Sequence, residues 1–236
     1  MRFKPRYKSC FWTKTDIWGN LLKKKGFFKP KWERLLGSLI SKKRRRYQKL
    51  CKNYSLLKPS SRPNQPYKYP RWNFRNSLAN RLYLRRFYGD LSCSAFKKII
   101  HRTKNVNNFV QVLESRLDIT LYRLGFFSSI FESRQAILHG KLLINGQKVF
   151  FDHLSLKFGD VVEFCPSYRI TIRNNLLLRR KTVEYLFKLK VYPTPAWIQT
   201  DYANLSFIVI GKANLTIFYP FYAELDEVIC SAKYSY

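Results

Sequence analysis

Side chains that bind phosphate are concentrated between residues 116 and 148 of this sequence. Guanidinium, ammonium and imidazole groups donate hydrogen bonds to phosphate oxygens. Cations spread over two helices and a hairpin can contact phosphates on both sides of a folded RNA helix. We therefore expect one RNA-binding surface whose solvent side carries Arg116, Arg123, Arg134, Gln135, His139, Lys141 and Lys148.

The other reactive groups do not form a pattern typical of catalysis or metal binding. Asp118 lies close to Arg116, so we expect it to orient an arginine by a charge-assisted hydrogen bond rather than to catalyse. The five cysteines are scattered without a C-x-x-C pair, which argues against a zinc site and a disulfide framework. We therefore predict no enzymatic activity, no metal and no cofactor.

A first short helix is predicted just after residue 115. Leu117, Leu121 and Leu124 follow the i, i+4, i+7 spacing of one apolar helix stripe that faces a core. Gly125 then supplies a residue that is free to adopt positive φ, which is typical of a helix end. This helix places the first of the phosphate-binding side chains.

A second helix and a hairpin complete the predicted unit. Ser129 and Glu132 have the spacing of a capping box, and Gly140 closes the helix that starts there. Asn145-Gly146, between the apolar segments 142–144 and 148–151, is a strong hairpin signal. The strand 161–165 ends the unit before Pro166.

The overall charge favours a polyanionic partner. The 236 residues contain 45 Lys and Arg against 14 Asp and Glu, which gives a net charge of +31. Such a charge attracts polyanions, with nucleic acid as the favoured partner and an anionic membrane as the weaker alternative. No apolar run approaches the roughly 20 residues that span a bilayer, so we predict no membrane span.

The N-terminal 70 residues form a basic extension. An amphipathic helix is predicted from about Lys31 to Leu50, and a linker is predicted where prolines recur up to Pro70. The basic run in this helix favours an arm that becomes ordered on RNA over a nuclear-localisation signal. Its members are Lys42, Lys43, Arg44, Arg45 and Arg46.

The segments on either side of the central unit are predicted to be mainly helical. Residues 71–115 have helical spacing, and 174–190 form a basic amphipathic helix. Segments 207–210 and 215–218 are predicted to form a hairpin across a short linker. Several aromatic side chains fit apolar faces, so we expect core packing for Phe126, Phe127, Phe131, Phe150 and Phe151.

These residues resemble the small RNA-binding module named after small-subunit ribosomal protein S-four. The matching pattern is R-L-D at 116–118, Y-R-L-G-F at 122–126, E-x-R-Q at 132–135, H-G at 139–140, I-N-G at 144–146 and F-G-D-V-V at 158–162. The same module occurs in pseudouridine synthases, some aminoacyl-tRNA synthetases and a small heat-shock RNA binder. The module by itself therefore implies only binding to structured RNA.

Flanking segments narrow the resemblance to the ribosomal family. R-R-F-Y-G at 85–89 resembles the family's R-R-x-Y-G, and P-A-W-I-Q-T-D at 195–201 resembles its P-x-W-L-x-x-D. Ile130 stands where the family commonly has arginine, which removes one RNA contact, and 23–58 has no clear family counterpart. The chain is identified as a divergent member of the S-four family of small-subunit ribosomal proteins.

The resemblance implies an α+β fold in which the RNA-binding module, two helices on a short antiparallel sheet, is inserted into a mainly helical domain. The expected parts are the extension 1–70, a helical domain 71–114, the module 115–166, and a C-terminal segment 167–236 that returns to the helical domain. Beyond the basic run and the seven side chains named above, the expected RNA-binding residues are Arg81, Arg85, Arg86 and Asn145.

The implied function is that of a structural constituent of the small ribosomal subunit. The family binds a helix junction in the 5′ domain of small-subunit rRNA early in assembly and lies near the mRNA entrance, so the implied partners are rRNA, neighbouring ribosomal proteins and mRNA. The alternatives are a free RNA-binding factor and an RNA-modifying enzyme similar to the pseudouridine synthases, each carrying the same module.

The composition also bears on location. The sequence has 19 Phe and 16 Tyr against 9 Gly, together with abundant Lys and Asn, which is typical of translation from an AT-rich organelle genome. The first residues do not form the clean amphipathic pattern of a cleaved presequence. Residues 6–22 faintly resemble the start of the family, which favours an organelle-encoded protein without a cleaved segment. Plastid members of the family usually stay closer to the bacterial sequence, so the resemblance implies a mitochondrial protein, with a plastid as the weaker alternative.

Overall fold

The computed structural model describes residues 7–18, 30–50, 70–103, 105–188 and 195–212, together with 219, 221, 225, 226, 228 and 229; the side chains of 42–50, 70–76 and 178–188 lie outside this description. The chain forms two compact units. We call Arg6–Arg102 with Thr216–Tyr236 the helical unit and Thr103–Leu215 the sheet unit, and treat each by itself.

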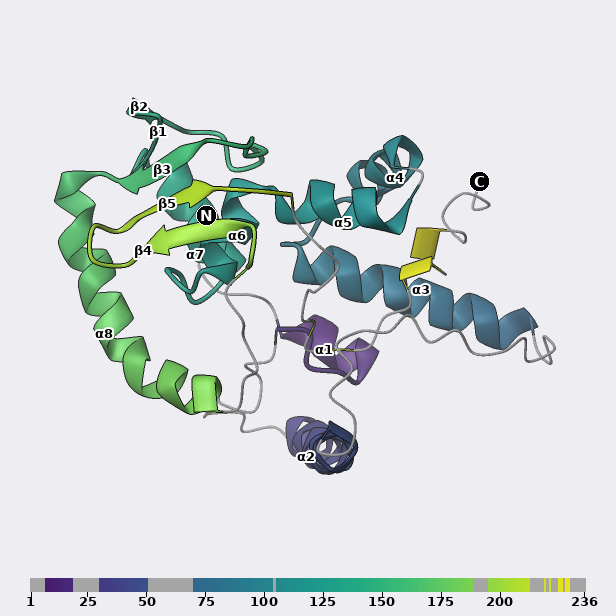
Figure 1. Cartoon of the computed structure of the whole chain (residues 1–236). Helices are drawn as coiled ribbons and strands as arrows, with labels where there is room; N and C mark the ends of the chain where they lie inside the picture. The colour runs from purple at the N-terminus through teal and green to yellow at the C-terminus, as the bar shows by residue number, and fades with distance from the viewer. Residues whose placement is uncertain are drawn as a thin grey trace. The chain divides into compact units, whose positions relative to one another are not determined.

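The described part of the helical unit contains the helices α1 (Lys8–Thr13), α2 (Pro30–Leu50), α3 (Pro70–Phe87) and α4 (Cys93–Arg102) (Figure 1). Both α2 and α3 begin with proline, whose fixed φ suits the first helical position and whose missing amide would have no partner there. The predicted helix at 31–50 and the predicted helical character of 71–102 are confirmed.

Aromatic rings form the core of the helical unit. Phe87 and Tyr88, at the end of α3, are almost completely buried. The Phe87 ring centroid lies 5.4 Å from that of Tyr219 and 5.7 Å from that of Phe221. The hydroxyl oxygens of Tyr88 and Tyr219 are 2.5 Å apart. These contacts attach a C-terminal part of the chain to α3 within this unit.

The sheet unit begins with three helices, α5 (Val106–Glu114), α6 (Leu117–Arg123) and α7 (Ile130–Leu138). The strands β1 (Leu142–Ile144), β2 (Gln147–Lys148) and β3 (Val161–Phe164) follow. The long helix α8 (Pro166–Lys188) then precedes β4 (Ile198–Asp201) and β5 (Ser206–Val209), as Figure 1 shows. The predicted α+β class is confirmed.

All neighbouring strands of the sheet are antiparallel, in the order β2-β1-β3-β5-β4. The central strands alternate buried and more exposed positions, and the buried side chains of Val162, Phe164 and Phe207 share one face. Figure 1 shows α6 and α7 against the sheet. The three leucines of the predicted α6 stripe are buried, which confirms that stripe.

The predicted helix and turn signals of this unit are confirmed. The Ser129 hydroxyl accepts a hydrogen bond from the Glu132 amide and starts α7, while the Glu132 carboxylate accepts from the Ser128 amide. Asn145 and Gly146 have φ values of 50° and 83°, the left-handed conformation that a tight hairpin turn requires at both positions. The turn joins β1 to β2 as predicted.

The chain is divided differently from the expected boundaries. The two units meet in sequence between Arg102 and Thr103, so α5 belongs with the module rather than with the helical domain. β4 and β5 extend the module's sheet through pairs such as Val161–Ile208, because the free edge of β3 can take a further strand. β4 and β5 therefore belong to the sheet unit, whereas Thr216–Tyr236 belongs to the helical unit.

Two further predictions differ in detail. The predicted helix 174–190 begins earlier, at Pro166, where proline again occupies the first helical position. Strand 206–209 forms a hairpin with 198–201, and segment 215–218, its predicted partner, lies outside the described residues.

Candidate nucleic-acid interface

Asp118 organises a buried charge cluster between α6 and α7. Its carboxylate, which is inaccessible to solvent, accepts a hydrogen bond from Arg116 Nη2 at 2.7 Å and another from Arg134 Nε at 2.7 Å. It also accepts from the Ile119 amide at 2.9 Å, at the start of α6. Bidentate and charge-assisted bonds of this kind fix the orientation of both guanidinium groups. The expectation that Asp118 orients an arginine is confirmed.

The two arginines also anchor the loop between β2 and β3. Arg116 Nη2 donates to His153 Nδ1 at 2.9 Å, and Arg134 Nε lies 3.7 Å from an Asp152 carboxylate oxygen. Partial burial, and next the positive charge of Arg116, lower the pKa of His153 despite the nearby Asp152 carboxylate. A neutral imidazole is the form that can accept the Arg116 hydrogen bond at Nδ1.

Arg123 has a comparable structural role at the other end of α6. Its Nη2 and Nε atoms donate to the two carboxylate oxygens of Glu114 at 2.8 and 3.0 Å, and the Glu114 side chain is inaccessible to solvent. This bidentate pair fixes α6 against the end of α5. Sequence reasoning did not identify Glu114, although a buried arginine requires such a partner.

The expectation that the arginines of the module lie on its solvent side is wrong. The side chains of Arg116, Arg123 and Arg134 are 6%, 11% and 12% exposed, respectively. The physical reason is that Asp118 and Glu114 are buried carboxylates, and a buried carboxylate requires a cation beside it. The arginines supply these cations and are buried with them. These arginines therefore stabilise the unit through buried ion pairs and are not exposed on its surface.

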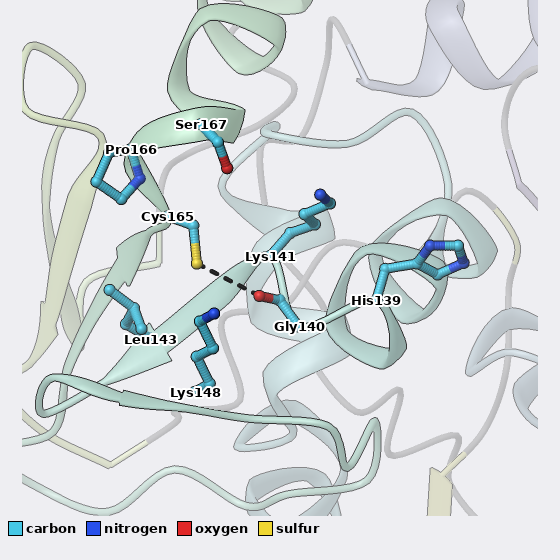
Figure 2. Close-up of a pocket in the computed structure, with 8 residues that line it drawn as sticks. All are labelled: His139, Gly140, Lys141, Leu143, Lys148, Cys165, Pro166 and Ser167. Atoms are coloured by element: carbon cyan, nitrogen blue, oxygen red, sulfur yellow. Dashed lines mark hydrogen bonds between the residues drawn. The ribbon is translucent and has the colours of Figure 1, made fainter.

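Two lysines and a histidine of the module line a cleft of about 410 Å³ between α7, the β1–β2 hairpin and the start of α8. Figure 2 shows its lining side chains, with Lys141 and Lys148 coming from the hairpin and Ser167 from α8. The lining residues are His139, Gly140, Lys141, Leu143, Lys148, Cys165, Pro166 and Ser167. His139 and Lys148 are exposed, and Lys141 is half-buried.

The backbone around Gly140 gives the cleft its shape. Gly140 has a φ of 61°, which turns the chain from the end of α7 into β1 and places His139 and Lys141 on either side of it. The Gly140 carbonyl accepts a hydrogen bond from the Cys165 thiol at 3.3 Å (Figure 2). Lys141 Nζ lies 5.8 Å from the centroid of the Tyr168 ring, which retains the ammonium group beside α8.

Two of the predicted RNA-contact residues, Gln135 and Asn145, do not line the cleft. Gln135 is half-buried, and its Oε1 atom accepts no hydrogen bond from the described part of the chain. Asn145 stabilises the hairpin turn: its Nδ2 donates to Asp160, and its Oδ1 accepts from the Val161 amide at 3.0 Å. Asn145 nevertheless stays exposed at the hairpin tip.

The predicted contact residues of the helical unit lie on α3, and all three are half-buried. Arg85 Nε donates to the Leu91 carbonyl at 3.0 Å, and Arg86 forms an ion pair with Asp90 at 2.9 Å. Arg81 lies one turn before Arg85 on the same helix. The basic run Lys42–Arg46 lies within α2, and its side chains are outside the described part of the chain.

Three of the five phenylalanines that were expected in the core are buried, and the two in the loop between β2 and β3 are exposed. Phe126, Phe127 and Phe131 are buried as predicted. Phe150 and Phe151 are 53% and 76% exposed, so the prediction of core packing is wrong for these two. The short strand β2 ends at Lys148, and the following residues leave the sheet before they can contribute to its buried face.

Neither a metal site nor a membrane helix is present among the described residues. Their His, Cys, Asp and Glu side chains form no group of three or more that could hold a metal ion. None of the described helices has the length and apolarity to cross a bilayer.

Comparisons with known proteins agree with the geometry of this unit. The S4 domain family matches residues 115–150. Small ribosomal subunit protein uS4m of Reclinomonas americana is 25% identical over 253 residues, covering 97% of this chain and 97% of that protein. Protein uS4 of Rickettsia canadensis is 31% identical over 150 residues, covering 60% of this chain and 68% of that protein.

A third relative is small ribosomal subunit protein uS4B of Clostridium acetobutylicum, which is 38% identical over 138 residues, covering 55% of this chain and 64% of that protein. The relatives are named as ribosomal proteins and not as enzymes. The chain contains the S4 domain and the antiparallel sheet with its two covering helices, and the matches extend well beyond that domain. We conclude that the chain belongs to the small ribosomal subunit protein uS4 family.

Proposed function

We propose that the chain is a structural constituent of the mitochondrial small ribosomal subunit and binds its rRNA. The observation that carries this proposal is the pair of lysines that line the cleft, in a unit whose arginines are already paired with buried carboxylates. Accessible charges bind phosphates, whereas paired buried charges hold the binding surface in shape. The net charge of +31 supports the same partner.

The proposed contacts follow from exposure. His139, Lys141 and Lys148 contact phosphates directly. Gln135, one turn before His139 on α7, and Asn145, at the tip of the β1–β2 hairpin, add contacts to the same RNA. Arg116, Arg123 and Arg134 position α6, α7 and the loop after β2. Arg81, Arg85 and Arg86 on α3, together with the basic run Lys42–Arg46, provide further phosphate contacts from the helical unit.

At a finer level, we propose that residues 115–166 act as the RNA-binding module and clamp a helix junction in the rRNA 5′ domain early in assembly. The basic residues of 1–70 extend this contact. The proposed position is near the mRNA entrance, beside other small-subunit proteins. We also propose a place in the mitochondrial matrix and a gene in the organelle genome: similarity to the uS4m protein of Reclinomonas americana along almost the whole chain supports a mitochondrial protein, and the composition supports the organelle gene.

The salt dependence of binding to a transcript of the rRNA 5′ domain tests this function. Neutralising about eight phosphates predicts a log–log slope of roughly −6 to −7 for the association constant against salt concentration. Lys148→Gln removes one accessible cation and should make the slope shallower by about one. Lys98→Gln makes the same charge change at an exposed position of α4 and should leave the slope unchanged. A nearly flat slope for the unmodified chain would contradict the proposal.

A further inference from the structure

We infer that the cleft between α7, the β1–β2 hairpin and α8 holds one unpaired nucleotide of the bound RNA, with its base against Phe150 and its phosphate between Lys141 and Lys148. The inference rests on the proposed RNA-binding function and specifies which RNA feature the module selects. Its basis is the combination of an apolar floor, a cationic rim and an exposed aromatic ring at one place.

The cleft has the two kinds of surface that a nucleotide requires. Leu143, Cys165 and Pro166 supply an apolar floor, while Lys141 and Lys148 supply ammonium groups (Figure 2). Its volume of about 410 Å³ lies in the range of sites that enclose small organic ligands. A phosphate alone would not need the apolar floor, and an apolar ligand alone would not need two ammonium groups.

Phe150 provides the stacking surface. Its ring adjoins the cleft at Gly140 rather than lining it: a Cβ atom placed on Gly140 would be 2.6 Å from Phe150 Cε1. The remainder of the ring is open, since the residue is 53% exposed. An exposed phenyl ring that adjoins a cleft lined by lysines is an arrangement on which single-stranded bases can stack.

The charges around the cleft favour RNA over a protein partner. None of the residues that line it is acidic. The carboxylates in the adjoining loop are already engaged: Asp152 lies beside Arg134, and Asp160 accepts hydrogen bonds from the Lys157 amide and from Asn145. The start of the 23-residue helix α8, with Ser167 in the cleft wall, adds a favourable potential for an anion.

An unpaired nucleotide also fits the geometry better than a base-paired one. A base within a duplex has both faces covered by its neighbours, so neither face is available to a phenyl ring. The ring of Phe150 can stack only on a base that has left its helix, at a bulge, a loop or a junction. The inference therefore predicts that the module prefers RNA with unpaired positions over uniform duplex.

The test compares two phenylalanines of the same loop. Fluorescence anisotropy would measure the affinity of the full chain for the 5′-domain transcript, a short single-stranded oligoadenylate and a blunt RNA duplex, at one salt concentration. Phe150→Ala should weaken binding to the transcript and the oligoadenylate by about fivefold or more and leave duplex binding unchanged. Phe151→Ala removes an equally large exposed ring that neither lines the cleft nor adjoins Gly140, and should leave all three affinities unchanged.

Two substitutions separate stacking from loss of shape. Phe150→Leu keeps an apolar side chain over Gly140 without a ring and should also lose affinity, whereas Phe150→Trp should retain it. Equal affinities for Phe150→Ala and the unmodified chain, or equal losses for Phe150→Ala and Phe151→Ala, would overturn the inference while the proposed function stands. Failure of the unmodified chain to bind the transcript would overturn both.

Discussion

At the scale of single residues, Asp118 determines what two of the module's arginines do. It accepts hydrogen bonds from Arg116 and Arg134, and its side chain is inaccessible to solvent. A buried carboxylate with two guanidinium partners is stable only while the charges remain balanced. The guanidinium groups that appear available for RNA in the sequence are therefore committed to holding α6, α7 and the loop after β2 together.

Asp118→Asn should strongly destabilise the sheet unit. The amide removes the buried negative charge that faces both guanidinium groups and leaves Arg134 only the more distant Asp152 carboxylate, so the free energy of unfolding should fall by about 3 kcal/mol or more. Glu163→Gln is the matched control, because the Glu163–Arg169 pair is 44% and 35% exposed and should contribute at most about 1 kcal/mol. Urea unfolding measures both; equal effects would contradict the structural role of Asp118.

His153 should give the unit a specific pH dependence. Burial and the nearby Arg116 lower its pKa in the folded chain from the ordinary value of 6.5, so the unfolded chain binds more protons as the pH falls. The contribution to stability is present above about pH 6.5 and is lost as the pH falls from there through the lowered pKa. His153→Gln should reduce the drop in the urea midpoint across this window. An unchanged drop would show that His153 is not the group responsible.

At the scale of elements, the β1–β2 hairpin presents the exposed cations. Asn145 and Gly146 take the left-handed conformation at the turn, and the paired strands carry Lys148 outward. The orientation of Lys148 relative to Lys141 therefore depends on a turn that few residue types can form.

Gly146→Ala should destabilise the hairpin, whereas Gly37→Ala should have the opposite effect. Gly146 has a φ of 83°, which costs an L-residue about 1–2 kcal/mol. Gly37 lies within α2, where an added Cβ atom would meet nothing within 4 Å, so alanine should add about 0.5–1 kcal/mol of stability. Thermal unfolding of both variants checks the signs. A neutral Gly146→Ala would be inconsistent with the described turn.

The elements of the module were predictable where their signals are local. The Ser129 cap, the leucine stripe of α6 and the Asn145-Gly146 turn each depend on residues a few positions apart, and all three are confirmed. The burial of the arginines was not predictable, because their partners lie elsewhere in the chain: Arg123 pairs with Glu114, and Arg134 approaches Asp152.

The same distinction applies to the sheet and to the cleft. β5 pairs with β3 and with β4, and no local pattern in the sequence connects these segments, so neither pairing was predicted. His139, Lys141 and Lys148 were identified from their types and positions, but the cleft that they share also requires Pro166 and Ser167 from α8. Phe150 and Phe151 look like core residues in the sequence because exposure depends on where β2 ends.

At the scale of the whole molecule, the net charge of +31 opposes folding and favours assembly on RNA. Like charges repel one another in the free chain, and binding to phosphates replaces this repulsion by attraction and releases counterions. The buried ion pairs of Asp118 and Glu114 reduce this repulsion within the sheet unit. A chain of this kind should therefore be more resistant to unfolding when bound to rRNA than when free.

Sedimentation of mitochondrial lysate through a gradient at about 0.5 M monovalent salt, with detection of this chain in each fraction, tests the central claim most directly. A structural constituent with many phosphate and protein contacts should sediment with the small ribosomal subunit at one copy per particle. Release to the top of the gradient, or a substoichiometric association, would contradict the claim and favour a free RNA-binding factor.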